Sequence, residues 1–138
     1  MEKIKDRYDY VIFDCPTDIN MAVINAFCVT DDVLIPIKID RYALDGLEYV
    51  VEVIGELQEF NPKLTLKGGF ITMFRNNNVN KSGKELLNNN LGFNFFQTAI
   101  RCTVKADEST FEKPLPLYAP KSTAAIDYRN LVAEYLEK

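Results

Sequence analysis

A short apolar stretch at residues 8–16 constrains the fold of this 138-residue chain most strongly. Residues 11–13 are Val-Ile-Phe, a run of β-branched and aromatic side chains that predicts a strand buried on both faces. Asp14 follows directly, and Pro16 ends the strand because proline has no N–H to donate to a neighbour. Open parallel α/β sheets bind ligands at the carboxyl ends of their strands. Asp14 is therefore either a magnesium ligand or a solvated carboxylate that caps the next helix.

Strand and helix patterns alternate along the rest of the chain. Buried strands are predicted at residues 33–37, at 64–74 with its centre at 69–73, and within 93–100. Helices are predicted at residues 21–27 behind the cap Asp18, 42–60, 82–91 and 123–137 behind the cap Ser122, with a short helical turn at 103–109. A polar loop is predicted at residues 75–83 and an extended, proline-punctuated segment at 111–119. This alternation predicts an α/β fold, a mostly parallel sheet with flanking helices, in a single domain over residues 1–138.

The last predicted helix, residues 123–137, is amphipathic. Ala125, Tyr128, Leu131, Val132 and Tyr135 recur on one of its faces at helical spacing. We expect that face to be buried.

The composition excludes several classes of site. The chain has no histidine, so neither Ser-His nor Cys-His catalysis is available to it. Cys15, Cys28 and Cys102 are odd in number and widely spaced, which argues against a zinc site and a disulfide framework. We expect free thiols, buried at Cys15 and Cys28. No apolar run is long enough for a transmembrane helix, and the charged N-terminus lacks a signal core, so a cytoplasmic protein without membrane association is expected.

The net charge of −4 conceals an asymmetry along the chain. Residues 1–60 carry a net charge of −8, and residues 61–138 carry +4. Between residues 63 and 105 there are seven basic side chains and one acidic one, Glu85. Such a segment can form a surface for a polyanion, or it can be an ordinary solvated face.

Six stretches carry a more specific signal. They are YDYVIFDCP (residues 8–16), INAF (24–27), VLIP with YALDGL (33–36 and 42–47), ITMF (71–74), IRCTVKADES (100–109) and KPLPLYAPKSTAAIDYRNL (113–131). In this order they resemble the C-terminal half of the deviant-Walker partition ATPases, the ParA/Soj/MinD group within the SIMIBI class of P-loop proteins. The resemblance covers nearly the whole chain and implies a P-loop NTPase fold that lacks its N-terminal part.

The resemblance implies a site for ATP and Mg²⁺. Asp14 corresponds to the family's Walker B aspartate, which supports the magnesium ion. Thr72 lies at a strand end that approaches the nucleotide in relatives. Arg101 and Thr103 lie in a segment that resembles the family's base-contacting loop.

The resemblance also implies macromolecular partners. In the family, an ATP-dependent dimer binds DNA non-specifically, and a ParB-like partner protein stimulates hydrolysis, so the expected location is nucleoid-associated. Lys105 matches a DNA-contacting position of the family, and Arg75, Lys81 and Lys84 lie in the neighbouring segment. Binding of this kind is to phosphates, and it is therefore sequence-blind and strongly dependent on salt.

One family feature has no counterpart in these 138 residues, namely the Walker A loop with its glycines and lysines. Gly68 and Gly69 precede a strand core instead of linking a strand to a helix, so they do not form a phosphate loop. Asp14 alone cannot neutralise the β- and γ-phosphates. We therefore expect this chain alone neither to bind ATP tightly nor to hydrolyse it, and to be a fragment of a longer ATPase or a truncated reading frame.

Two other functions stay open at this stage. A non-catalytic pseudo-ATPase could act as an interaction module that pairs with another ATPase, and an uncovered side of its sheet would favour self-association. A MinD-like membrane-associated ATPase would need a further amphipathic helix after residues 123–137, where this sequence ends.

Overall fold

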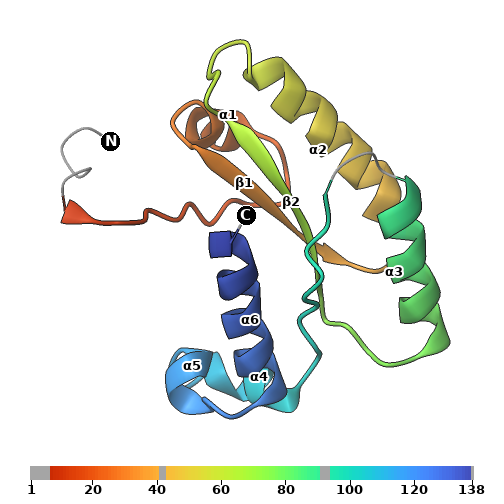
Figure 1. Ribbon diagram of the computed structural model, residues 1–138. Coiled ribbons are helices and arrows are strands. Elements are labelled where there is room, and N and C mark those ends of the chain that lie inside the picture. Colours follow the sequence, from red (N-terminus) through yellow and green to blue (C-terminus); the bar gives the residue numbers. More distant parts are fainter. Residues whose placement is uncertain (1–6, 41–42, 91–93, 138) are drawn as a thin grey trace. The chain divides into compact units, whose positions relative to one another are not determined.

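The computed structural model describes residues 7–40, 43–90 and 94–137. The elements, in chain order, are α1 (Met21–Phe27), β1 (Asp32–Lys38), α2 (Ala43–Leu57), β2 (Thr65–Thr72), α3 (Asn78–Asn90), α4 (Val104–Ser109), α5 (Leu115–Tyr118) and α6 (Thr123–Glu137) (Figure 1). The chain divides into two compact units, unit 1 from residues 1–33 and 47–66, and unit 2 from residues 34–46 and 67–138. The single domain expected from the sequence stays a prediction.

Unit 1 contains α1 and most of α2. Asn20 caps α1, because its Oδ1 accepts hydrogen bonds from the backbone N–H groups of Ala22 (2.9 Å) and Val23 (3.3 Å). The prediction of Asp18 as the cap is therefore wrong, and the observed cap lies two residues later. Further along unit 1, Asn61 donates from Nδ2 to the carbonyl oxygens of Phe27 (2.9 Å) and Thr30 (2.7 Å). This amide ties the end of α1 to the turn that follows α2.

The stretch at residues 8–16 is not a strand in the structure. No described residue pairs with its backbone, and the side chain of Ile12 is 90% exposed. A strand buried on both faces needs neighbouring strands for its N–H and C=O groups and helices over its side chains. β1 and β2 instead pair with each other, so the prediction of a buried strand is wrong for these residues. Cys15 and Cys28 are free, as predicted, but exposed, which contradicts their expected burial.

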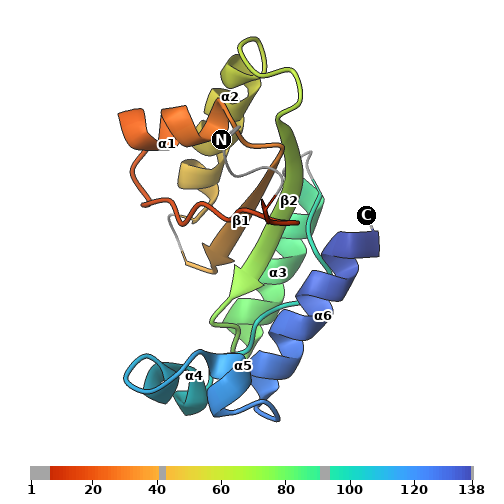
Figure 2. The same ribbon diagram turned by 90° about the vertical axis from the view of Figure 1, so that its left-hand side faces the viewer.

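Unit 2 holds the sheet and most of the core. β1 and β2 pair, and they run in the same direction (Figure 2). Residues 94–102 continue alongside β2, joined to it by the parallel bridges Gly69–Phe95 and Phe74–Arg101. The segment predicted as a strand at residues 93–100 thus lies parallel to β2, but as isolated bridges instead of a continuous strand, and residue 93 lies outside the described residues. The α/β fold with a parallel sheet and flanking helices is confirmed.

Gly68 allows residues 94–102 to approach β2 closely. Its φ of +145° is a conformation that side chains disfavour, and a Cβ there would lie 2.3 Å from the carbonyl oxygen of Asn94. This glycine therefore serves strand contact, in agreement with the prediction that it is not part of a phosphate loop.

The helix α3 begins earlier than the sequence indicated. Asn77 caps it by accepting a hydrogen bond on Oδ1 from the N–H of Asn80 at 2.9 Å, so residues 78–83 are helical and not part of a polar loop. Asparagine side chains favour loops and helix caps for the same reason, because they accept hydrogen bonds from nearby backbone groups. Inside α3, a Cβ at Gly83 would lie 2.3 Å from Cγ2 of Ile39, so the missing side chain brings the helix against the residue that follows β1.

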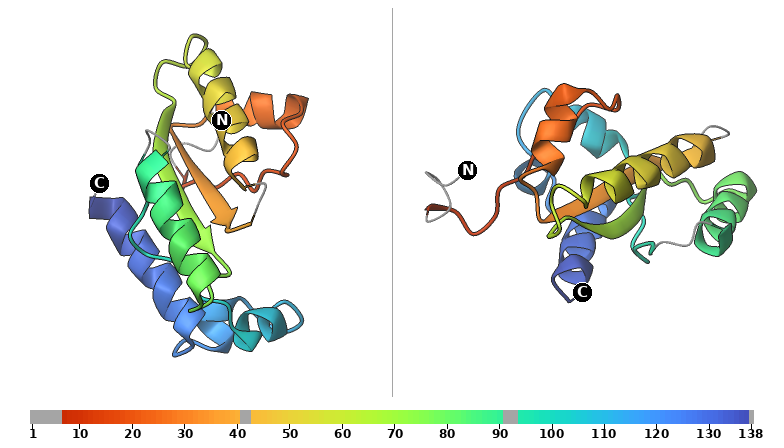
Figure 3. Two further views of the ribbon diagram at one scale, coloured as in Figure 1. Left: turned by 90° about the vertical axis from the view of Figure 1, so that its right-hand side faces the viewer. Right: turned by 90° about the horizontal axis from the view of Figure 1, so that it is seen from above.

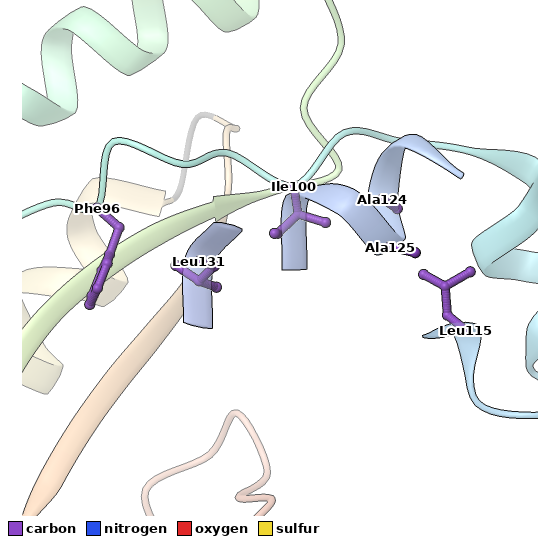
Figure 4. Packing of buried hydrophobic residues seen from close by; sticks show 6 residues of the cluster. All are labelled: Phe96, Ile100, Leu115, Ala124, Ala125 and Leu131. Atoms are coloured by element: carbon purple, nitrogen blue, oxygen red, sulfur yellow. The ribbon is translucent and has the colours of Figure 1, made fainter. Parts of the chain in front are cut away.

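The main hydrophobic cluster of unit 2 lies between residues 94–102, α5 and α6 (Figure 4). Its members are Phe96, Ile100, Leu115, Ala124, Ala125 and Leu131. Leu34 of β1 and Phe70 of β2 pack against this cluster, which therefore joins α6 to the sheet. The left view of Figure 3 shows α4 and α5 beside the first turn of α6.

The predicted helix at residues 123–137 is confirmed, with a partly different buried face. Tyr128 and Val132 are exposed, whereas Ala124 and Asp127 are buried. The segment predicted to be extended at residues 111–119 contains the short helix α5. Pro114 stands just before α5, where a missing N–H costs nothing because the first N–H groups of a helix have no partner within it.

Candidate functional site

The carboxyl ends of β1, β2 and residues 94–102 meet at one edge of unit 2, because all three segments are parallel. A shallow cavity of about 500 Å³ opens there, lined by Phe74, Arg75, Asn76, Arg101, Cys102 and Thr123. A second cavity of about 380 Å³ is lined by Lys38, Ile39, Met73, Arg75, Asn80 and Cys102. Arg75 and Cys102 line both. This edge is where α/β sheets bind ligands, so we take it as the candidate site.

Arg101 is fastened to α6 at this edge. Its Nε donates to Oδ2 of Asp127 at 2.8 Å and its Nη2 donates to Oδ1 at 2.7 Å, a two-pronged ion pair. The backbone N–H of Arg101 also donates to Oδ2, at 3.0 Å. Asp127 is 6% exposed, and among the described residues it is the one charged residue that is buried. The carboxylate thus fixes both the guanidinium and the backbone where residues 94–102 leave the sheet.

The ion pair shifts the proton equilibria of both groups. Burial alone raises the pKa of Asp127, but the hydrogen bonds from the side chain and backbone of Arg101 outweigh it, so the pKa lies below its usual range. The hydrogen bond and charge of Asp127 raise the pKa of Arg101 further above its already high value. Both groups are therefore charged at neutral pH.

The end of β2 carries backbone strain at the same edge. Met73 has a φ of +52°, in the left-handed region that non-glycine residues seldom adopt. The residue before it, Thr72, is half-buried. Such conformations persist where the surrounding structure enforces them, and they often occur at binding sites.

Thr103 and Lys105 already have partners within the chain. Thr103 caps α4, accepting a hydrogen bond on Oγ1 from the N–H of Lys105 at 3.3 Å. Nζ of Lys105 pairs with Oε2 of Glu108 at 2.6 Å, and Tyr118 donates its hydroxyl to the same oxygen at 2.9 Å. The hydrogen bonds from Lys105 and then Tyr118 lower the pKa of Glu108. Lys105 also lies 5.8 Å from the ring centre of Tyr118.

The other basic residues of the predicted DNA surface differ in their contacts. Lys84 donates from Nζ to the carbonyl oxygen of Gln97 at 2.9 Å. Lys81 is exposed. Arg75 is exposed, and its Nη2 lies 3.9 Å from Sγ of Cys102, a weak contact. All four predicted residues belong to unit 2, and their DNA-binding role stays a prediction.

Asp14 belongs to unit 1, and it is exposed. No group of three or more Asp, Glu, Cys or His side chains that could hold a metal occurs among the residues described. A lone exposed carboxylate fits a magnesium ion only where a nucleotide supplies the phosphate oxygens, as is usual for this ion. The predicted nucleotide residues Thr72, Arg101 and Thr103 gather at the edge of unit 2, but Arg101 and Thr103 also hold the fold together there.

Asp127 is the main residue of this site that the sequence did not reveal. An acidic residue three positions after Ala124 and four before Leu131 stands on the buried face of α6. An acidic side chain on an apolar helix face signals a buried partner, because an unpaired buried charge is costly. That signal could have identified the pair with Arg101.

Comparison with known proteins shows which proteins this chain resembles. A family model described as an AAA domain matches residues 1–66. The parallel α/β fold of the chain is consistent with this match.

Three individual relatives show in more detail which proteins this chain resembles. The chain is 31% identical over 137 residues to the sporulation initiation inhibitor protein Soj of Bacillus subtilis, covering 97% of this chain and 54% of Soj. It is 31% identical over 135 residues to the chromosome partitioning protein ParA of Myxococcus xanthus, covering 96% of this chain and 48% of ParA. An uncharacterized protein of Pseudomonas putida is 32% identical over 142 residues, covering 98% of this chain and 52% of its own length. The chain is similar to these ParA and Soj proteins, and it spans about half the length of these relatives.

Among the helices in the described part of the chain, none is both long and apolar enough to cross a membrane.

Proposed function

We propose that this chain serves in a partitioning system as the DNA-binding part of a ParA/Soj-type ATPase. The similarity to chromosome partitioning proteins over 95% or more of the chain carries this proposal. In the proposed complete protein, ATP and Mg²⁺ hold two copies together, the dimer binds DNA without regard to sequence, and a ParB-like protein stimulates hydrolysis. It acts in the cytoplasm on the nucleoid.

Four side chains are proposed to contact DNA phosphates, namely Arg75, Lys81, Lys84 and Lys105. They lie in a segment rich in basic residues, within a chain whose overall charge is negative. Attraction to DNA would therefore be local to this surface. A few phosphate contacts give weak binding, with dissociation constants of about 10⁻⁴ to 10⁻⁶ M near physiological salt.

Charge reversal tests the DNA surface. Arg75→Glu with Lys81→Glu should lower the affinity for a fluorescein-labelled duplex by about tenfold or more, since two phosphate contacts become repulsive. Fluorescence anisotropy would measure the affinity for two duplexes of unrelated sequence, and both should be affected equally.

A matched control separates local contact from net charge. Lys63→Glu with Lys113→Glu changes the net charge by the same amount, at exposed positions outside the four proposed contacts. The affinity of this control should stay within about twofold of the parent. An equal loss in the control and in Arg75→Glu with Lys81→Glu would contradict a localised DNA surface.

ATP chemistry is proposed to need groups beyond these residues. Asp14 is assigned to the magnesium ion, and Thr72, Arg101 and Thr103 to the nucleotide. When bound, ATP and Mg²⁺ supply the phosphate oxygens and the metal charge that complete such a site. The 138 residues contain no glycine-rich phosphate loop, so they should show no phosphate release from ATP above a protein-free blank. Turnover that Asp14→Asn abolishes would contradict this expectation.

A second candidate is a non-catalytic module that pairs with another ATPase chain or with itself. The exposed apolar residues 8–13 favour it, because Tyr8, Tyr10 and Ile12 are each more than half exposed. Light scattering coupled to size exclusion tests it. A strictly monomeric, soluble chain would argue against this candidate.

A further inference from the structure

Cationic side chains line both cavities at the carboxyl edge of unit 2. Lys38 and Arg101 each line one of them and Arg75 lines both, and no acidic residue of the described chain lines either cavity. The guanidinium of Arg101 is neutralised by Asp127, so Arg75 and Lys38 supply the net positive charge. A concave site with unopposed cations attracts anions more strongly than a flat surface does.

Arg75 is held in place before any ligand arrives. Its backbone N–H donates to Oδ1 of Asn80 at 3.1 Å, and its carbonyl oxygen accepts from the N–H of Asn77 at 2.8 Å. Asn80 is in turn fixed by Asn77, since its Nδ2 donates to Oδ1 of Asn77 at 3.0 Å. These hydrogen bonds fix the backbone that carries the guanidinium, which lowers the entropy cost of binding.

Arg75 and Lys38 also differ from the other cations near this edge. Arg101 and Lys105 have ion pairs, and Lys84 donates to a carbonyl oxygen. Within the described chain, Arg75 and Lys38 have no ion pair at all, and the weak contact to Cys102 leaves the guanidinium donors available. Binding an anion at this pair therefore breaks no existing salt bridge.

We propose that Arg75 and Lys38 bind a phosphate group in the second cavity, which both residues line, and this deepens the proposed function by assigning its phosphate contact. Arg75 can donate two parallel hydrogen bonds to phosphate oxygens, and Lys38 adds a compact point charge. Asn76 and Thr123 line the first cavity, which Arg75 also lines, and offer neutral donors there. The volume of the second cavity, about 380 Å³, exceeds one phosphate and suits a nucleotide or a stretch of nucleic-acid backbone. The shared ligand chemistry is a phosphate ester with a free anionic oxygen.

Arg75→Gln and Lys38→Gln test the pair in the full chain, with inorganic phosphate, ADP and a labelled duplex as the three probes. Each variant should weaken binding of the probe that binds the parent by about tenfold, while Lys63→Gln stays within about twofold. Calorimetry for the small probes and anisotropy for the duplex give the affinities. Urea unfolding confirms that each variant is folded.

The three probes distinguish the sources of the phosphate group. Duplex binding that depends on both residues identifies the nucleic-acid backbone, and ADP binding without duplex binding identifies a nucleotide and removes the DNA function instead. Duplex binding lost in Lys81→Gln but unchanged in Arg75→Gln and Lys38→Gln overturns the phosphate site and leaves the DNA function standing. A parent chain that binds none of the three probes overturns both.

Discussion

Replacing Asp127 with alanine is expected to lower the free energy of unfolding by about 3 kcal/mol, since it removes one partner of a buried ion pair. Three hydrogen bonds from Arg101 end on this carboxylate, including one from the backbone. Arg101 keeps a side chain that is 49% exposed, so water can solvate the abandoned guanidinium and the loss stays at the lower end of the range for buried pairs. Urea unfolding monitored by circular dichroism measures the change.

The pH dependence of stability gives the same pair a second test. The folded-state pKa of Asp127 is depressed below its unfolded value of 3.8, so its contribution is fully present above about pH 5. That contribution is lost as the pH falls through the depressed folded value. The parent should therefore lose more stability than Asp127→Asn between pH 5 and strongly acid solution. Equal losses in both proteins would mean that the pair adds nothing to stability.

An exposed acidic residue of the same helix provides the control for both measurements. Glu137 lies at the end of α6 and is exposed. Glu137→Gln should change the free energy of unfolding by less than about 0.5 kcal/mol. A loss as large as that of Asp127→Ala would show that α6 is sensitive to any change of charge.

Gly68→Ala should destabilise the chain by a comparable amount, about 3 kcal/mol, because it combines a strained backbone angle with a steric clash. The added Cβ would meet the carbonyl oxygen of Asn94 at 2.3 Å, and a backbone atom cannot move aside as a flexible side chain can. Residues 94–102 would have to separate from β2, which takes Arg101 away from the candidate site. Urea unfolding measures the free energy, and the emission of a dye at Cys102 would report on the site.

Gly55→Ala is the matched control for this substitution. Gly55 lies within α2, and nothing stands within 4 Å of the position that its Cβ would take. Because alanine has a higher helix propensity than glycine, the free energy of unfolding of this variant should rise by up to about 1 kcal/mol. If Gly68→Ala were as stable as the parent, the close contact between β2 and Asn94 would be contradicted.

The elements that could be predicted from the sequence are those with a clear local pattern of apolar spacing and capping residues. The helix at residues 123–137 has the predicted bounds, and Thr103 precedes the short helix at Val104–Ser109. The carboxyl edge of the sheet was predictable as a site because it follows from parallel strands alone. Arg75 and Arg101 line the cavities at this edge, and their roles in binding stay predictions.

Other features depend on contacts that no local pattern contains. Residues 8–16 have the composition of a central strand, yet burial requires partners that the described chain does not give them. The asparagines at residues 76–78 favour a loop and a helix cap equally, and only the fold decides between them. Arg101, the partner of Asp127, lies 26 residues away in the sequence, so their ion pair could be identified only from the structure.

Salt dependence of duplex binding tests the proposed DNA function most directly. The affinity of the full chain for a labelled duplex would be measured by anisotropy between about 50 and 200 mM salt, on two unrelated sequences. With up to four phosphate contacts, the logarithm of the association constant should fall with the logarithm of salt concentration with a slope as steep as about −3.6, equally for both duplexes. No binding at low salt, or binding that salt leaves unchanged, would contradict a phosphate-led, sequence-blind DNA surface on this chain.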